Sequence, residues 1–408
     1  MNRWRDDFGR CDVLIAGAGL AGSALAARLA QAGRGVVLVD PRPLGRSGYM
    51  DHGRLHQFVP AASQTNDVQW MPTSCVARLQ RLGLDRWREQ SQAEPLSDVL
   101  GLWGEPGGRD LFRAHPANGG WRIARRALDA AVLQNALDLG TLGLDGMTFC
   151  RLRRHSAGWR VLLDDGDHWL TIDASIVVDA TGGAACVARQ LGVRAVRADP
   201  MVAVSFIAQR APNAPGDPSL TLFESCPAGW WHVHDGGGGA RRFMLLTDAD
   251  LVPRGKSDMW SLLHQTLQEA PASLLRMVES EHTSELEVLP CSNRVLRHVC
   301  GEGWLALGDA ALTCDPLSAS GVDLALTSAE LAQATIDRAC AGVGSAWVGY
   351  NASAQSTFTL ASATRAAFCC QERRWPDAPF WARRRQPTLV RKDRAAADDN
   401  ANAVEMTA

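Results

Sequence analysis

The sequence predicts an α/β protein with a parallel-sheet domain assembled from separate stretches of the chain. An antiparallel sheet is inserted between these stretches, and a helical C-terminal region follows them. Three observations predict this fold class. A strand, a glycine-rich turn, a helix and a second strand follow one another near the N-terminus. Two more strand-and-turn segments lie near residues 180 and 310. Between them, residues 200–250 have the pattern of antiparallel strands.

Length and composition exclude several classes of protein. A chain of 408 residues is long enough for two domains with a large buried core. Its net charge of −2 gives no electrostatic reason to bind nucleic acid. The 11 cysteines are odd in number and contain no Cys-x-x-Cys pair, which argues against a metal site or a disulfide framework. With no apolar run of about 18 residues and no apolar segment at the start, we expect no membrane span and a cytoplasmic location.

The first β–α–β unit begins with a buried strand at residues 12–16. The turn Gly17-Ala18-Gly19-Leu20-Ala21-Gly22 follows at once, and the alanine- and leucine-rich residues 20–32 are predicted to form a helix. A second strand, residues 36–39, ends in Asp40. The two strands of such a unit are parallel.

The glycine-rich turn predicts a dinucleotide site. Gly17 permits the tight turn, Gly19 lets the backbone approach a pyrophosphate, and Gly22 lets helix and strand pack closely. The pyrophosphate then lies at the helix N-terminus, where free N–H groups and the helix dipole favour an anion. Asp40 is placed to accept hydrogen bonds from a ribose. A lone glycine motif is weak evidence, but here the strand, the helix, the second strand and the acid all occur at the required spacing.

The rest of the chain divides into further elements. Residues 41–75 are rich in Gly, Pro, His, Ser and Asn and are predicted to be irregular. The pattern then predicts helices over residues 76–87, 122–139, 257–283 and 322–341, strand-like alternation over 159–178, strands at 201–208, 243–246 and 304–307, and a four-glycine turn at 236–239. The polar tail from residue 386 is predicted to be disordered.

Two later stretches complete a flavin-binding pattern. The second motif, Val178-Asp179-Ala180-Thr181-Gly182, closes a strand. The third begins at residues 303–311 and continues through residues 315–322. Its Asp309 ends a strand and can bind a ribityl hydroxyl, while Gly321 and Val322 open a helix whose N-terminus can face the pyrimidine edge of a flavin. That edge becomes negative on reduction, so a helix dipole stabilises it.

In these three motifs the chain resembles the flavoprotein monooxygenases of the para-hydroxybenzoate hydroxylase type. The resemblance implies that the first motif binds ADP and that the Gly308-Asp309 stretch binds the ribityl chain. It also implies that Arg125, four residues before Asp129, reaches the FAD from a helix, although Arg126 competes for this role. The FAD contacts so implied are Gly17, Gly19, Ala21, Gly22, Asp40, Arg125, Asp309, Pro316, Ser320, Gly321 and Val322.

Three further stretches narrow the resemblance to the tryptophan-halogenase-like branch. They are Asp315-Pro316-Leu317-Ser318-Ala319-Ser320-Gly321, then Gly229-Trp230-Trp231 followed by residues 246–251, and the late stretch at residues 372–381. Together they are most similar to the flavoproteins that mature tryptophylquinone enzymes, namely quinohaemoprotein amine dehydrogenase and the lysine and glycine oxidases. The similarity extends over most of residues 11–385.

The resemblance implies a domain organisation. A Rossmann-like FAD-binding domain of the GR2 type, α/β and discontinuous, would comprise residues 11–75, 120–195 and 295–345. A substrate-binding domain with an inserted antiparallel β-sheet would comprise residues 76–119 and 196–294. A helical C-terminal region, residues 346–385, and a disordered tail, residues 386–408, would complete the chain.

The resemblance also implies a reaction. Reduced FAD reacts with O2 to give a C4a-hydroperoxide, which delivers an electrophilic oxygen to an electron-rich ring. The family members most similar to this chain hydroxylate a tryptophan side chain within a partner polypeptide, on the way to a tryptophylquinone cofactor. Electrons would come from NAD(P)H or from reduced flavin supplied by a separate reductase, because no second Gly-x-Gly-x-x-Gly is present. No metal is implied.

Trp230, Trp231 and His232 are the candidate substrate contacts. Tryptophans can stack on an aromatic substrate, but core packing explains them equally well. His232 and His234 would share one face of a strand, where they either line the substrate cavity or stand at ordinary half-exposed positions. No catalytic residue can be placed from the sequence, and since an indole is electron-rich, no strong general base is required.

Two departures argue against halogenation. A halogenase is expected to carry a Gly-Trp-x-Trp-x-Ile-Pro stretch where residues 229–235 read Gly-Trp-Trp-His-Val-His-Asp, and lysine is nearly absent. The alternatives to peptidyl-tryptophan hydroxylation are a halogenase or hydroxylase of a free small aromatic metabolite, an FAD-dependent reductase of an isoprenoid chain, and a flavin-binding chaperone without turnover. A polypeptide substrate predicts an open groove, a metabolite a closed pocket, and an isoprenoid a long apolar tunnel.

Overall fold

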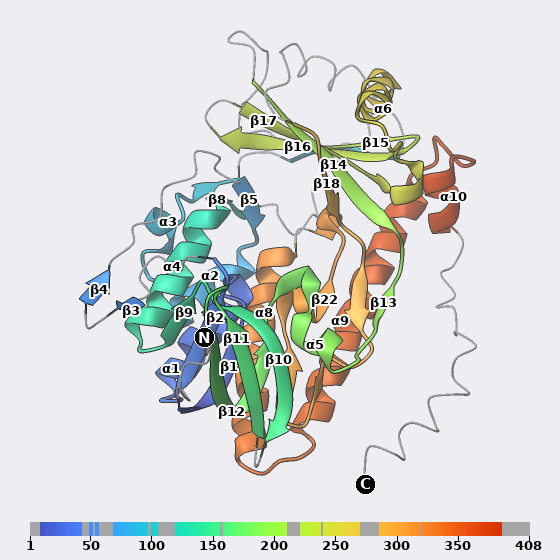
Figure 1. The fold of residues 1–408 in the computed structure, drawn as a ribbon. Helices are drawn as coiled ribbons and strands as arrows, with labels where there is room; N and C mark the ends of the chain where they lie inside the picture. The colour runs from blue at the N-terminus through green and yellow to red at the C-terminus, as the bar shows by residue number, and fades with distance from the viewer. Residues whose placement is uncertain are drawn as a thin grey trace, which may run out of the picture.

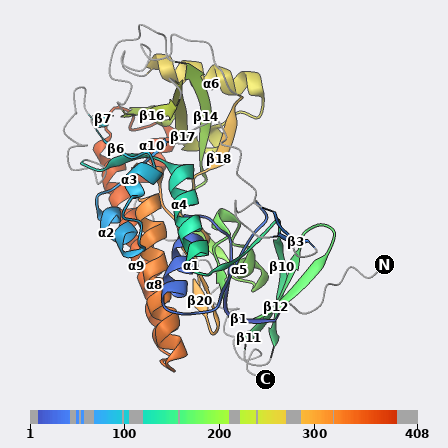
Figure 2. The same ribbon diagram turned by 90° about the vertical axis from the view of Figure 1, so that its left-hand side faces the viewer.

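The computed structural model describes residues 9–42, 49–51, 54–56, 68–96, 99–104, 119–155, 158–209, 221–237, 240–269, 285–318 and 320–385. A parallel-sheet domain forms one part of the molecule and an antiparallel sheet the other (Figure 1). Long C-terminal helices run along the side of the first part and reach the second, as the turned view shows (Figure 2). This confirms the predicted α/β fold with an inserted antiparallel sheet and a helical C-terminal region.

The parallel-sheet domain is built on the strand order β10-β11-β12-β1-β2-β9, with β21 paired to β12 and β20 to β21. Its central strands pair in parallel and are rich in buried Val, Leu and Ile, as expected for a sheet covered on both faces. The strands are β1 Arg10–Ala16, β2 Val36–Asp40, β9 Leu142–Asp145, β10 Thr148–His155, β11 Gly158–Asp164, β12 Trp169–Asp179, β20 Cys300–Gly301 and β21 Trp304–Ala306.

Three helices pack together beside this sheet. Helix α1, Leu20–Gln31, lies against both α4, Arg125–Asp138, and α8, Gly321–Cys340. Alanines fill much of the buried surface of α1, which lets its backbone approach its neighbours closely. The short helix α5, Cys186–Gln190, contacts β10 and β12. The predicted first β–α–β unit is therefore confirmed.

The antiparallel sheet has the order β18-β14-β17-β16-β15-β7. Helix α6, Lys256–Glu269, covers its outer face, and its inner face turns toward the parallel-sheet domain (Figure 1). The strands are β7 Val99–Leu102, β14 Met201–Gln209, β15 Thr221–Cys226, β16 Gly229–Gly237, β17 Ala240–Asp248 and β18 Glu287–Pro290. The predicted helix over residues 257–283 agrees with α6 as far as residue 269, and residues 270–284 lie outside the described residues.

Two small sheets connect these parts. One joins β5 Val68–Met71, β8 Trp121–Ala124 and β6 Glu94–Pro95, and the other joins β13 Ala195–Arg197, β19 Arg294–Leu296 and β22 Leu312–Thr313. The strands β3 Tyr49–Asp51 and β4 Arg54–His56 form a separate pair. Strands β3, β4 and β5 therefore lie within the stretch predicted to be irregular.

Two predicted helices have different bounds in the structure. Residues 76–87 form α2, Ser74–Arg81, and then turn at Gly83, whose φ of +83° ends the helix before α3, Trp87–Gln90. The helix predicted over residues 122–139 begins only at Arg125, because residues 121–124 pair with β5 as strand β8. Backbone pairing with a distant strand overrides the helical pattern there.

The C-terminal region holds the antiparallel sheet against the rest of the protein. Helix α9, Ala346–Gln371, leads to α10, Pro379–Arg385. The indole N–H of Trp381 donates to the carbonyl of Cys226 at 2.8 Å, and Arg384 bonds the buried carboxylate of Asp248 at 2.6 Å. The predicted tail, residues 386–408, lies outside the described residues. No helix of the described part is long and apolar enough to cross a membrane.

Candidate flavin site

The first glycine-rich turn is pressed against the second motif. Gly17 has a φ of +111°, and a Cβ there would lie 2.2 Å from the carbonyl oxygen of Ala180, so only glycine fits. A Cβ on Gly22 would lie 2.0 Å from the Gly17 carbonyl oxygen. By contrast, a Cβ on Gly19 would meet nothing within 4 Å, so this position faces open space. Helix α1 starts there with no side-chain cap and no acidic residue in its first turn, which leaves its N–H groups for an anion.

Asp179 fixes the second motif in place. Its buried carboxylate accepts hydrogen bonds from the backbone N–H and hydroxyl of Thr181, at 3.1 and 2.7 Å, and from the N–H of Ala188 at 2.9 Å. Its carbonyl oxygen accepts from the N–H of Leu307 at 3.0 Å, which joins the second motif to the third. Asp179 is thus a structural residue that sets the distance between the motifs.

Asp309 in the third motif lies at the surface, in the turn directly after strand β21. Its side chain is accessible to solvent, yet surrounding protein atoms desolvate it and raise the pKa of its carboxyl. The charges of Arg125 and Arg294 act on that pKa in the opposite direction, so both guanidinium groups are near. Arg294 also donates to the Asp309 carbonyl oxygen at 2.6 Å. A carboxyl that is both accessible and surrounded by protein suits a ligand hydroxyl.

Arg125 is the first residue of α4 and lies near Asp309. It donates to Asp129 at 2.7 Å and to the side-chain oxygen of Gln69 at 2.9 Å. Arg126, the competing candidate, is exposed. Of the two arginines, the structure brings Arg125 to Asp309.

Asp40 lies where a ribose is expected, but its carboxylate already has several donors. It accepts from the N–H of Ala18 at 2.8 Å and from the guanidinium and backbone N–H of Arg42 at 2.9 Å. Burial alone raises the pKa of Asp40, but these hydrogen bonds outweigh it and lower the pKa. The Arg42 side chain is 71% exposed and can swing away, so ribose hydroxyls can replace it.

The remaining predicted contacts surround the start of α8. Pro316 begins a short 3-10 turn, Pro316–Ser318, and Ser320 occupies the N-cap of α8 without a side-chain cap. A Cβ on Gly321 would meet nothing within 4 Å, whereas Val322 is buried. The N-terminus of α8 is therefore open, like that of α1. Ala21 joins the two ends of the site, because a Cβ on Gly308 would lie 2.8 Å from its own.

Comparison with known proteins indicates the class of enzyme to which these motifs belong. A family model described as FAD dependent oxidoreductase matches residues 12–101, which include the first glycine-rich turn. The chain is an FAD-dependent oxidoreductase. The residues present fit FAD, because Gly19 and Gly321 leave space at two helix N-termini and the Asp309 side chain is accessible to solvent.

Relatives by sequence share the oxidoreductase character. The chain is 25% identical over 292 residues to a Marinomonas mediterranea protein provisionally named FAD-dependent oxidoreductase LodB, covering 69% of this chain and 76% of that protein. It is 28% identical over 352 residues to the menaquinone reductase of Mycolicibacterium smegmatis, covering 79% of this chain and 75% of the relative.

Solved structures share the fold. The chondrochloren halogenase CndH superposes with a TM-score of 0.75 at 17% identity, covering 98% of this chain and 89% of that one. The peptidyl tryptophan dihydroxylase QhpG, essential for tryptophylquinone cofactor biogenesis, superposes with a TM-score of 0.69 at 23% identity, covering 92% and 78%. At these identities the likeness shows a common flavoprotein fold.

Three cross-strand pairs follow one another on the inner face of the antiparallel sheet. Trp230 lies opposite Leu246, His232 opposite Met244, and His234 opposite Arg242. The first pair is fully buried, whereas His232 and Met244 are both only partly buried. Both members of the middle pair thus keep part of their surface accessible, and this partly exposed part of the inner face is called the opening below.

Aromatic rings surround this opening. The ring of Phe223 stacks on His232 at a centroid distance of 4.7 Å, and Trp70 of β5 meets His232 edge-on at 5.5 Å. Leu317, from the turn before α8, joins the same apolar cluster as Trp230 and Trp70. The apolar cluster around the opening thus extends to Leu317 in the turn that leads to α8.

Trp231 has a different position from its neighbour. It is 0% exposed and packs on the outer face with Phe206, beneath α6. Trp230 faces inward but is 2% exposed and belongs to the core. The two tryptophans therefore do not share a surface, and of the three candidate substrate contacts only His232 borders the opening.

Sequence reasoning missed Trp70, Phe223, Met244 and Arg294. Trp70 comes from a stretch predicted to be irregular, so nothing indicated its strand. The alternation in residues 201–208 and 243–246 was visible, and with the strand register it would have placed Met244 on the inner face.

Proposed function

We propose that this oxidoreductase is a monooxygenase that hydroxylates the indole ring of a tryptophan side chain in a partner protein during tryptophylquinone biogenesis. The observation that carries the proposal is the opening at His232 and Met244, framed by Trp70 and Phe223 and connected by packing to the turn before α8. An aromatic ring that enters there meets apolar and aromatic walls.

The chain's own groups bind and orient the ring. Bound reduced flavin, with O2 as co-substrate, supplies the electrophilic oxygen. Trp70 and Phe223 exclude water and provide ring edges and faces against which an indole packs. His232 contributes the stacked imidazole ring that it presents beside Phe223 to this wall. The indole needs no prior deprotonation, so no strong general base is required.

The lysines support hydroxylation over halogenation. The sequence contains two, Lys256 and Lys392. Lys256 is the first residue of α6, on the outer side of the sheet, and pairs with Glu285 at 3.3 Å. Lys392 lies outside the described residues. A halogenase-type lysine beside the inner face is therefore not among the described residues.

The same proposal includes a partner protein as substrate and a source of electrons. A tryptophan within a polypeptide is the substrate, and NAD(P)H or reduced flavin from a separate reductase supplies the electrons. The reaction takes place in the cytoplasm. The fold shared with a peptidyl tryptophan dihydroxylase supports a polypeptide substrate.

The test is a single aerobic turnover with isotopically labelled O2. The FAD-loaded protein is reduced, mixed with a tryptophan-containing partner polypeptide or with free indoles, and exposed to the labelled gas. Label on the polypeptide supports the proposal. If free indoles are oxidised or halogenated while the polypeptide stays unlabelled, the substrate is a free metabolite and the proposal is wrong.

A second candidate function is the reduction of an apolar quinone or isoprenoid. It is favoured by the relative named menaquinone reductase, at 28% identity, and by the apolar character of the inner face. The two functions differ in their need for oxygen. Reoxidation of the reduced flavin by a quinone under strictly anaerobic conditions would favour this second function.

A further inference from the structure

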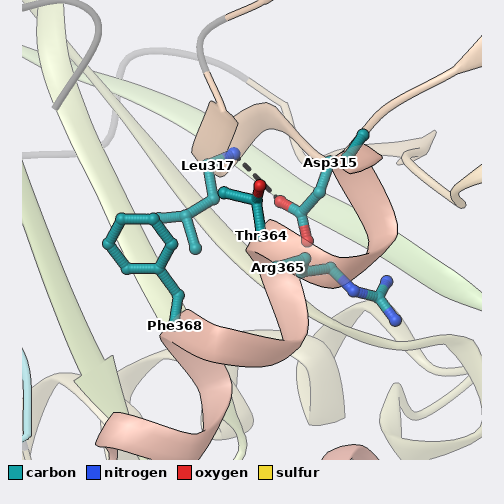
Figure 3. A pocket seen from close by; sticks show the side chains of 6 residues that line it. Asp315, Leu317, Thr364, Arg365 and Phe368 are labelled. Atoms are coloured by element: carbon teal, nitrogen blue, oxygen red, sulfur yellow. Dashed lines mark hydrogen bonds between the residues drawn. The ribbon is translucent and has the colours of Figure 1, made fainter. Parts of the chain in front are cut away.

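Asp315 is a buried carboxyl at the base of the turn before α8. Its side chain accepts the N–H of Leu317 at 2.9 Å and is 4% exposed (Figure 3). It also lines a small pocket between this turn and α9, whose other walls are Leu317, Ala361, Thr364, Arg365 and Phe368. Thr364 is exposed, so the pocket reaches the surface of α9. Solvent can therefore approach a carboxyl that the fold otherwise encloses.

Two guanidinium groups lie in this region, and each bonds another carboxylate. Arg365 of α9 bonds Asp199, and Arg384 of α10 bonds Asp248 at 2.6 and 3.1 Å. Desolvation raises the pKa of Asp315 to about 6, against the opposing effects of the Leu317 N–H and of Arg384. The carboxyl can thus hold or release a proton near neutral pH.

Among the described residues, three thiols also lie close enough to Asp315 for its charge to act on their pKa. Cys291 precedes β19, Cys314 follows β22, and Cys369 belongs to α9. Burial raises the pKa of Cys291 and Cys314 to about 11 and that of Cys369 to about 12. All three stay neutral in the range where Asp315 titrates, so they do not compete for its proton.

The same turn carries the predicted flavin contacts Pro316, Ser320 and Gly321. Reduction adds negative charge to the flavin beside the α8 N-terminus, and a carboxylate at the base of the turn opposes that charge. A neutral carboxyl does not. Protonation of Asp315 and reduction of the flavin must therefore favour each other, because coupling between two sites is reciprocal.

We propose that Asp315 takes up a proton from solvent, through the pocket beneath α9, when the bound flavin is reduced, and that it thereby sets the reduction potential. The inference rests on the FAD placement in the proposed function. In balanced form, oxidised FAD accepts two electrons and one proton to give the anionic reduced flavin, while the Asp315 carboxylate accepts a second proton. Asp315 is a positioning residue, because it acts through the turn and its charge.

The experiment measures the reduction potential of the bound FAD between about pH 5 and about pH 8 in wild type, Asp315→Asn and the control Asp250→Asn. Asp250 is an exposed partner of Arg383. Below about pH 6 the wild type and Asp315→Asn should agree, since the carboxyl is neutral in both redox states. Above it the wild-type potential should fall increasingly below that of Asp315→Asn, by up to about 30 mV per pH unit, the two-electron equivalent of one proton.

Asp250→Asn should follow the wild type. Parallel curves for wild type and Asp315→Asn would overturn the inference.

A pH-indicator dye gives an independent measure of proton uptake. On reduction at about pH 7, the wild-type protein should take up about one proton more than Asp315→Asn does. Ala361→Trp, which fills the pocket, should slow this uptake without changing its extent, and an unchanged rate would overturn the pocket as the route. If FAD binds and the partner is hydroxylated but the curves run parallel, this inference alone fails; if FAD does not bind, the proposed function fails with it.

Discussion

A Cβ placed on Gly308 would lie only 2.8 Å from the Cβ of Ala21, so the third motif of the flavin site rests directly on the first. These residues are far apart in sequence but form one wall. Any side chain at Gly308 must push this turn away from α1, the helix that we propose receives the pyrophosphate. The close packing of Gly308 on Ala21 is therefore expected to affect the affinity for FAD.

Gly308→Ala should weaken FAD binding by about fivefold to a hundredfold, because overpacking costs about 1–3 kcal/mol. Fluorescence titration of the apoprotein with FAD measures it. Gly192→Ala is the matched control, since Gly192 has a φ of +75° but open space around its Cβ position. It isolates backbone strain from the clash, and equal losses of FAD affinity in both variants would contradict this account.

Arg125→Ala should reduce FAD affinity by about tenfold to a hundredfold, because a hydrogen bond to a charged group contributes about 1.5–3 kcal/mol. Arg126→Ala should leave the affinity unchanged, since that side chain is exposed. The same titration compares them. A larger loss in Arg126→Ala would reverse the assignment of the helix arginine.

Met244→Trp should fill the opening on the inner face and abolish hydroxylation while FAD affinity stays as in the wild type. Trp231→Phe, on the neighbouring strand but the outer face, should lower stability by about 1 kcal/mol and leave turnover intact. Turnover and FAD titration on both variants check this. Full activity in Met244→Trp would show that substrate enters elsewhere.

Arg384→Met should lower the free energy of unfolding by about 3–5 kcal/mol, because it leaves the buried Asp248 carboxylate without its main partner. Arg383→Met serves as the control, since Arg383 also bonds Asp248 but is 44% exposed, and its loss should cost about 1 kcal/mol or less. Urea unfolding measures both. Similar costs would mean that the C-terminal helix is not anchored at Arg384.

Lys256→Ala should leave turnover unchanged, because Lys256 lies on the outer side of the sheet and makes an exposed ion pair. Steady-state oxygen uptake with the partner polypeptide is the readout. Loss of turnover with unchanged stability would assign this lysine a direct chemical role and restore halogenation as a candidate.

The flavin domain could be predicted from sequence because its motifs are local. The turn around Gly17 and the strand ending at Asp40 follow one another within a single β–α–β unit, so spacing alone indicates their relation. The antiparallel sheet was also predictable from alternation. Both depend on short-range periodicity, which the sequence displays directly.

The substrate side could not be predicted in the same way. Trp70 reaches His232 only because β5 pairs with β8, and no local signal in residues 41–75 indicates that pairing. Trp230 and Trp231 look equivalent in sequence, but strand alternation sends them to opposite faces. Long-range pairing and strand register, rather than composition, decide which side chains border the opening.

The most direct test of the central claim is tandem mass spectrometry of a partner polypeptide after one turnover of the reduced, FAD-loaded protein with O2. The account predicts one or two added oxygen atoms located on a tryptophan side chain, in wild type and Trp231→Phe but not in Met244→Trp. A polypeptide that stays unmodified while free indoles gain oxygen, or while a quinone is reduced without O2, would contradict it.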